Sequence, residues 1–105
     1  MIRGQMQGIL GYINDHISSP LTIEEVSGHF HYSGDYIAKI FREQFGVTMK
    51  QYIVEKKLSV AKRLLATSDI SVKQVGKAVG FGESALFEKF FKYHVKMTPK
   101  KYREQ

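Results

Sequence analysis

The chain has no cysteine among its 105 residues. This absence excludes disulfide cross-links, thiolate zinc sites and cysteine nucleophiles, and it fits a reducing cytoplasm. The four histidines, His16, His29, His31 and His94, are scattered along the sequence, and we interpret them as surface or packing residues. We therefore expect neither a bound metal nor another cofactor.

Long apolar runs are missing as well, and residues 1–11 lack the apolar core of a signal peptide. We expect a cytoplasmic protein that is neither exported nor inserted in a membrane. The sequence also lacks a nucleophile with its base, a pair of carboxylates or a metal constellation at a convincing spacing. We therefore do not expect an enzyme.

The apolar content is sufficient for a folded chain: 43% of the residues are hydrophobic, with seven Phe and six Tyr. A chain of 105 residues forms one compact domain or two small lobes. The formal net charge is +6, and it is unevenly placed. Residues 1–47 hold three basic and five acidic residues, whereas residues 48–105 hold thirteen and five. A polyanion such as nucleic acid should be attracted mainly to the second half, although a basic surface can also serve solubility alone.

The sequence repeats itself, because residues 22–52 can be laid over residues 71–102. The offset is 49 at first and becomes 50 after one inserted residue. The matched pairs are Thr22/Ser71, Ile23/Val72, Val26/Val75, Phe30/Val79, Tyr32/Phe81, Lys39/Lys89, Ile40/Phe90, Phe41/Phe91, Arg42/Lys92, Val47/Met97, Thr48/Thr98, Lys50/Lys100 and Tyr52/Tyr102.

Each copy predicts a helix, a tight turn and a second helix. Capping boxes are expected at Thr22 with Glu25 and at Ser71 with Gln74, where each side chain satisfies a backbone N–H of the helix start. The turns fall at 31–34, with a left-handed residue expected at His31, and at 80–82. The second helices are expected at about 33–45 and 83–94. Their predicted core residues are Ile37, Ile40, Phe41, Phe45, Leu86, Phe87, Phe90 and Phe91.

A long connecting helix over 49–67, with a capping box at Thr48 and Gln51, is predicted between the copies. A lead helix precedes the first copy, and a short helix follows Pro99. We thus expect an all-α fold of seven helices without strands. Its parts are subdomain one (5–47), the connecting helix (48–67) and subdomain two (68–105). The polar surface of the connecting helix is expected to include Lys56, Lys57, Lys62 and Arg63.

A helix-turn-helix unit inserts its second helix in the major groove of DNA. A connecting helix of 19 residues would be about 28 Å long, close to the roughly 34 Å of one turn of B-DNA. One chain could therefore reach two successive segments of the major groove. RNA is a poorer partner because its deep major groove excludes a helix.

An ordered set of residues then resembles the DNA-binding region of the AraC/XylS family of transcription regulators. The resemblance covers nearly the whole chain from about residue 5. Its residues are Leu21-Thr22-Ile23, Tyr32-Ser33, Tyr36-Ile37, Phe41-Arg42, Phe45-Gly46, Tyr52, Ala61, Leu64-Leu65, Ile70-Ser71-Val72, Val79-Gly80-Phe81, Phe87, Phe90-Phe91-Lys92, Thr98-Pro99 and Tyr102-Arg103.

The resemblance implies a bacterial regulator that binds double-stranded DNA sequence-specifically, activates transcription and contacts RNA polymerase. It assigns base contacts to one group of residues: Asp35, Tyr36, Ala38, Lys39, Glu83, Ser84, Ala85 and Lys89. It assigns phosphate contacts to a second group: Ser33, Arg42, Ser71 and Lys92. Lys39 and Lys89, at equivalent positions of the repeat, are our first choices for base reading.

Some residues fit this pattern less well. Asp35, Glu83 and Glu88 put negative charge where DNA should lie. An acid can accept a hydrogen bond from cytosine N4, but Asp35 and Glu83 are explained more simply by the positive N-terminal ends of their helices. Lys96 stands where the family usually has glycine, so the last turn is expected to differ slightly.

These acids also support an alternative function, a helical protein-interaction module with weak, non-specific affinity for DNA. The chain is either a small stand-alone protein or a fragment of a longer one, and its start at Met1-Ile2-Arg3 suits a fragment somewhat better. We expect the isolated domain to be a monomer and the longer protein to dimerise through a domain that is missing here.

Overall fold

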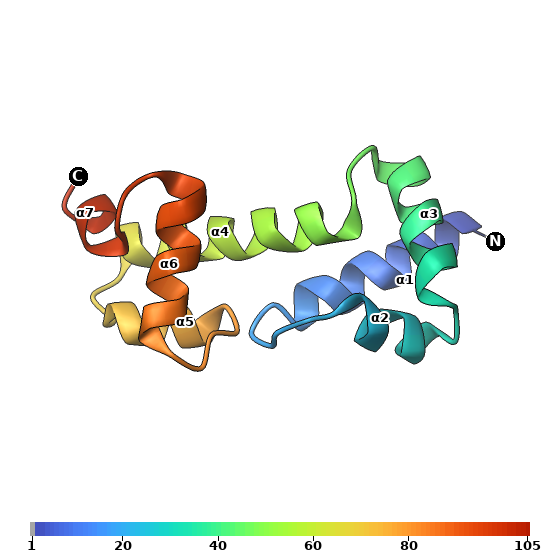
Figure 1. Cartoon of the computed structure of the whole chain (residues 1–105), viewed down its shortest axis with the longest axis horizontal. Helices are drawn as coiled ribbons and strands as arrows, with labels where there is room; N and C mark the ends of the chain where they lie inside the picture. Colours follow the sequence, from blue (N-terminus) through green and yellow to red (C-terminus); the bar gives the residue numbers. More distant parts are fainter. Residues whose placement is uncertain (1) are drawn as a thin grey trace. The chain divides into compact units, whose positions relative to one another are not determined.

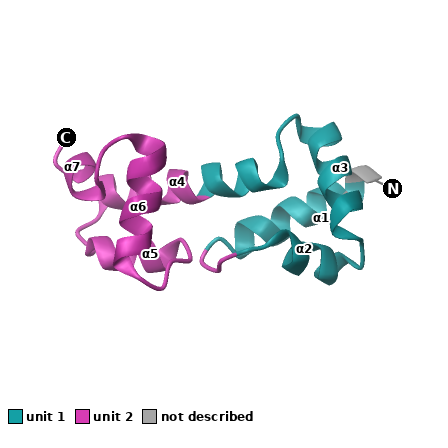
Figure 2. Cartoon of the chain, viewed as in Figure 1, with its two compact units in different colours: residues 1–17, 21–56 teal, residues 18–20, 57–105 magenta. Residues whose placement is uncertain are grey.

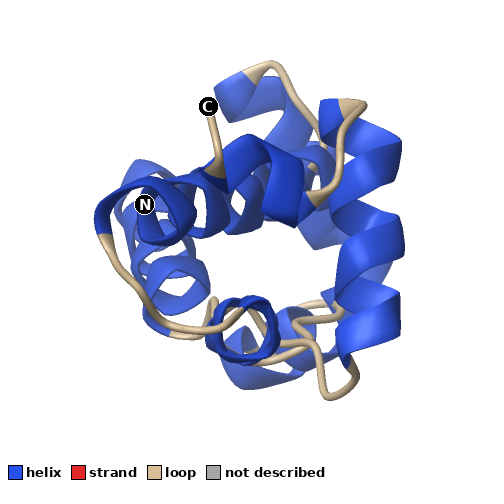
Figure 3. Cartoon of the chain, turned by 90° about the vertical axis from the view of Figure 1, so that its left-hand side faces the viewer, coloured by secondary structure: helices blue, strands red, loops and turns tan. Residues whose placement is uncertain are grey.

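The computed structural model describes the backbone of residues 2–105 and the side chains of residues 4 and 6–105. This part of the chain contains seven helices and no strand, as predicted (Figures 1 and 3). The helices are α1 (Ile2–Asp15), α2 (Ile23–Phe30), α3 (Gly34–Phe45), α4 (Met49–Thr67), α5 (Val72–Ala78), α6 (Ser84–Val95) and α7 (Pro99–Arg103).

The helices form two compact units (Figure 2). Unit 1 comprises residues 1–17 and 21–56, and unit 2 comprises residues 18–20 and 57–105. Helix α4 is continuous and contributes its first eight residues to unit 1 and the remainder to unit 2. Each unit contains one of the two predicted helix-turn-helix copies.

The core of unit 1 is built from the apolar faces of its four helical segments. The spacing of Met6, Ile9 and Ile13 gives α1 one apolar face, which is buried as predicted. Phe41 of α3 is fully buried. The other buried apolar residues of this unit are Ile17, Leu21, Val26, Ile37, Ile40, Met49 and Ile53.

The core of unit 2 is centred on Phe87 and Phe91 of α6, which are both fully buried. Their rings lie 5.8 Å apart between centroids. Gly76 of α5 lets the two helices approach closely, because a Cβ at this position would lie 2.9 Å from the Cβ of Phe87. Leu58, Ala61 and Leu65 of α4, with Val75 and Val79, complete this core.

Two of the three predicted capping boxes form completely. The Ser71 hydroxyl accepts from the Gln74 N–H while the Gln74 side chain accepts from the Ser71 N–H. Thr48 and Gln51 make the same reciprocal pair. At α2 only half of the box forms, because Thr22 Oγ1 accepts from the Glu25 N–H but the Glu25 carboxylate makes no return bond. The exposed carboxylate keeps its hydration instead.

Two other predictions about side chains are wrong. Leu86 was expected in the core of unit 2, but 52% of its surface is exposed, because Phe87 and Phe91 alone fill the buried face of α6. Lys57 was expected on the polar surface of α4, but only 5% of its surface is exposed. Its neighbours explain this burial, as described below. The expected left-handed residue is found, with His31 at φ 61°.

Candidate nucleic-acid interface

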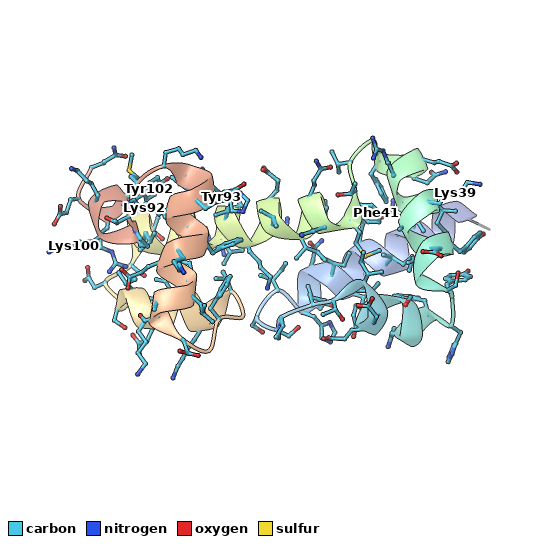
Figure 4. The ribbon with its side chains drawn as sticks, viewed as in Figure 1. Lys39, Phe41, Lys92, Tyr93, Lys100 and Tyr102 are labelled. Carbon is cyan, nitrogen blue, oxygen red and sulfur yellow. The ribbon has the colours of Figure 1, made fainter. Side chains whose placement is uncertain are left out.

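The helix-turn-helix of unit 1 presents one exposed face of its second helix. Helix α2 ends at the left-handed His31, and Ser33 then caps α3 by accepting from the Tyr36 N–H at 3.1 Å. Ile37 and Phe41 bury the inner face of α3, whereas Lys39 points outward (Figure 4). We call the opposite side the outer face of α3, formed by Asp35, Tyr36, Ala38, Lys39 and Arg42.

The helix-turn-helix of unit 2 repeats this arrangement. Helix α5 ends at Val79, Gly80 makes the turn with φ 93°, and Glu83 stands at the N-cap of α6. Phe87 and Phe91 bury the inner face of α6. The outer face of α6 is formed by Ser84, Ala85, Glu88, Lys89 and Lys92. Ser84 is partly exposed, and the other four are exposed.

Lys39 and Lys89 hold equivalent positions on these two outer faces. Both side chains are exposed. Within residues 2–105, neither ammonium group makes a hydrogen bond or an ion pair with another residue. Each ammonium is therefore free to donate to guanine O6 and N7 or to a phosphate.

The predicted phosphate-binding residues lie on the same structural elements. Arg42 and Lys92 are exposed, one turn further along α3 and α6 than Ala38 and Glu88 respectively. Ser33 and Ser71 stand at helix N-caps, where their hydroxyls already accept from backbone N–H groups. The remaining N–H groups of these first turns give each start a partial positive charge.

The acidic residues of the two helices differ in their surroundings. Asp35 lies in the first turn of α3, where a carboxylate is favoured by the helix dipole. Glu83 stands at the N-cap of α6, but its side chain makes no capping hydrogen bond. Glu88 lies beyond the first turn of α6 and gains little from the dipole.

Lys57 holds the turn that leads to α6. Its Nζ donates to the carbonyl oxygen of Ser19 and to that of Val79, each at 2.7 Å. Both carbonyls belong to non-helical backbone or a helix end, so they lack the partner that helix interiors supply. Burial lowers the pKa of Lys57 from 10.5 to about 8.

Neither Lys57 nor Glu88 was among the residues predicted to contact DNA. Nothing local distinguishes Lys57 from the other lysines of α4, because Ser19 and Val79, whose carbonyls it binds, lie 38 and 22 residues away in the sequence. The internal repeat could have identified Glu88 as a DNA-facing residue. At the offset of 50, Glu88 matches Ala38, which was among the predicted base-reading residues.

The described part of the chain has neither a candidate metal site nor a helix that could span a membrane. No cluster of three or more metal-ligating side chains forms in residues 2–105. In the same residues, none of the helices combines the length and the apolar character needed to span a membrane.

The arrangement of two helix-turn-helix units agrees with known proteins. A family model described as a helix-turn-helix domain matches residues 26–105, which is most of the chain. The chain belongs to the AraC-type helix-turn-helix family. Members of this family are DNA-binding transcription regulators, and the AraC-type domain is not an enzyme.

Individual relatives share this AraC-type domain. The regulatory protein PocR of Salmonella typhimurium is 31% identical over 101 residues, which are 96% of this chain and 33% of PocR. The chain thus spans a third of the length of that relative.

Solved structures have the same fold. The C-terminal domain of the two-component response regulator yesN from Fusobacterium nucleatum superimposes with a TM-score of 0.89 at 27% identity, over 95% of this chain and 98% of that one. The DNA-binding domain of the global transcriptional factor AdpA, solved in complex with a target DNA, gives a TM-score of 0.84 at 23% identity, over 94% of this chain and 89% of that one.

Proposed function

We propose that this AraC-type domain binds double-stranded DNA sequence-specifically and regulates transcription, as an activator in the bacterial cytoplasm. Helices α3 and α6 enter the major groove, and their outer faces read bases. The observation that carries the proposal is the pair of exposed, unbonded lysines at equivalent positions, Lys39 and Lys89. The target DNA in the AdpA complex supports the choice of ligand.

The proposed contacts follow from the position of each side chain. Asp35, Tyr36, Ala38 and Lys39 face bases in one segment of the major groove, and Glu83, Ser84, Ala85 and Lys89 face bases in a second. Arg42, Lys92 and the helix starts at Ser33 and Ser71 hold phosphates. The 19 residues of α4 give a connecting helix of about 28 Å, close to the roughly 34 Å of one turn of DNA.

We propose that this domain acts as part of a longer protein, because it corresponds to a third of the length of PocR. We propose that the isolated domain is a monomer, because each unit supplies its own second helix. In the longer protein, a domain beyond this sequence provides dimerisation, and the regulator contacts RNA polymerase to activate transcription. We also propose that the domain divides into subdomain one (5–47), the connecting helix (48–67) and subdomain two (68–105).

Selection of bound sequences from random double-stranded DNA, at about 0.15 M salt, tests base reading. We expect two short motifs about one helical turn apart. Lys39→Ala should reduce the base preferences in one motif, and Lys89→Ala should reduce those in the other. Each substitution removes the lysine proposed to read bases in its unit. Lys101→Ala, which removes an exposed lysine from α7, should leave both motifs intact.

The outcomes separate the possible functions. One motif that is lost only with Lys39→Ala would mean that unit 2 contacts only the DNA backbone. Absence of enrichment, with weak binding that vanishes as salt rises, would contradict sequence-specific binding by this domain and favour the protein-interaction module. The acidic side chains on the DNA-facing helices are the observation that supports that second function.

A salt titration tests the phosphate contacts. Arg42→Ala and Lys92→Ala should each weaken binding about equally for specific and non-specific DNA, because phosphate contacts carry no sequence information. Each substitution should also reduce the slope of log K against log salt by about 1, through the loss of one released counterion. A change in the selected motif with an unchanged slope would instead assign the residue to base reading.

A further inference from the structure

Glu88 lies on the outer face of α6, in the midst of the residues proposed to read DNA. Ser84 is one turn before it and Lys89 follows it directly, so the three side chains share one side of the helix. The Glu88 side chain is exposed, whereas the neighbouring Phe87, about 100° away around the helix axis, is fully buried. A helix that inserts this face in the major groove therefore carries a carboxylate to the base edges.

The carboxylate of Glu88 has no partner within the part of the chain that the structure describes. Lys92, four residues further along α6, is placed for a helical ion pair, yet no such pair forms between them. Glu88 is also beyond the first turn of α6, where the helix dipole would stabilise a negative charge. Neither a salt bridge nor the helix dipole accounts for an acid at this position.

The internal repeat gives an independent comparison. At the offset of 50, Glu88 of unit 2 corresponds to Ala38 of unit 1, and the adjacent lysines, Lys89 and Lys39, correspond to each other. The two outer faces thus share the cation and differ in the residue beside it. An alanine at this position can contact only the apolar thymine methyl, whereas a carboxylate is an acceptor of hydrogen bonds.

We propose that Glu88 is a specificity-determining residue of unit 2, which accepts a hydrogen bond from the N4 amino group of cytosine in the major groove. This inference rests on the proposed function, since it requires that α6 reads bases. It makes the two units read different sequences, although they are copies of one structural unit.

The hydrogen-bond donors and acceptors on the base edges favour cytosine as the partner of the Glu88 carboxylate. Guanine presents two acceptors, N7 and O6, and thymine presents the acceptor O4, so each repels a carboxylate. Adenine offers its N6 amino group beside the acceptor N7, which opposes the second carboxylate oxygen. Cytosine alone presents an amino donor without an adjacent acceptor. Lys89, beside Glu88, is suited to the acceptors of a guanine.

The proposal is tested with the wild-type domain, Glu88→Gln and Glu88→Ala, by selection from random duplexes followed by titration of the selected site. The wild type should select a cytosine in the motif of unit 2. Removal of the N4 amino group alone, by an analogue that has hydrogen at this position, should weaken binding about 10-fold or more. Glu88→Gln should shift the preference to adenine, because an amide pairs with adenine N6 and N7.

Glu88→Ala tests the role of Glu88 through two measurements, the selected motif and the affinity for duplexes, which would not change in this way if Glu88 were only structural. It should lose the preference for cytosine and bind duplexes without this cytosine more tightly than the wild type, because a negative charge is removed from the surface that faces DNA. Glu104→Gln is the matched control, since it neutralises an exposed acid of unit 2 outside α6. It should leave the motif unchanged.

The outcomes distinguish this inference from the proposed function. If the wild type enriches no motif at all, sequence-specific binding itself fails. If the wild type enriches two motifs and Glu88→Gln enriches the same two, the proposed function stands and the assignment of Glu88 is overturned.

Discussion

Replacement of Lys57 by Met should lower the free energy of unfolding by about 2–4 kcal/mol, because it leaves two carbonyl oxygens without their donor. Lys57 Nζ donates to Ser19 O and Val79 O at 2.7 Å, and the bond to Val79 is fully buried. Met keeps most of the length and apolar volume of the lysine stem, so the loss reports mainly the hydrogen bonds. Equilibrium denaturation with urea measures it.

The matched control is Lys77→Met, at an exposed lysine of α5 in the same unit. Surface substitutions of this kind usually change stability by less than about 0.5 kcal/mol. If Lys57→Met were as mild as Lys77→Met, Lys57 would not be holding the two backbone segments.

Lys57→Met should also reveal how the contribution of Lys57 to the free energy of unfolding depends on pH. The pKa of Lys57 is about 8 in the folded protein and 10.5 when unperturbed, so between these values the unfolded chain binds more protons at this residue. Stability that depends on Lys57 therefore rises as the pH is raised through this window. The neutral amine still has two N–H groups with which to donate to Ser19 O and Val79 O.

We accordingly expect the difference in stability between wild type and Lys57→Met to widen from about pH 8 to pH 10.5. All other groups are common to both proteins, so their contributions cancel in the difference. A difference that stays constant over this range would contradict the lowered pKa.

Gly80→Ala should destabilise unit 2 by at least about 3 kcal/mol, for two separate reasons. Gly80 has φ 93°, a region that residues with a Cβ rarely adopt. An added Cβ would lie 2.5 Å from Ser19 O and 2.8 Å from Ser19 C, which are backbone atoms that cannot rotate away. Thermal denaturation, with hydrogen exchange of the α5 and α6 amides, measures the loss.

Gly82→Ala is the control for this substitution, only two residues further along the same turn. A Cβ at Gly82 would meet no atom within 4 Å, so we expect a change of less than about 0.5 kcal/mol. Equal effects of the two substitutions would show that the close approach of Gly80 to Ser19 does not limit stability. Because Gly80 sets the direction of the chain before α6, Gly80→Ala should also weaken the motif read by unit 2.

Both predictions concern one contact region of unit 2, formed by Ser19, Lys57, Val79 and Gly80. This region fixes the backbone between α5 and α6, and none of its four residues is among the proposed DNA-facing residues. Its substitutions should therefore affect DNA binding through the position of α6, whereas Lys89→Ala acts at the bases directly.

The features that the sequence predicted well are local or periodic. The seven helices, the complete capping boxes at Ser71 and Thr48 and the left-handed His31 depend on residues within a few positions of one another. Each outer face follows from the helical period once the buried aromatic residues are known. The roles of the twelve proposed DNA-binding residues remain predictions, because they depend on a ligand.

Leu86 and Lys57 show where this reasoning fails. An apolar residue near two buried phenylalanines was expected in the core, yet 52% of the surface of Leu86 is exposed. A lysine in a helix rich in lysines was expected in solvent, yet Lys57 meets two carbonyls brought from distant parts of the sequence. In both cases the composition of the helix was known but its neighbours were not.

The sequence by itself determined the helices, their duplication in two helix-turn-helix units and the position of a lysine on each second helix, because capping and periodicity act over one or two turns. Only the tertiary structure decided that Leu86 is exposed, that Lys57 binds Ser19 and Val79, and that Gly80 admits no side chain. The last two properties depend on contacts between residues 19, 57, 79 and 80, whose meeting no local pattern specifies.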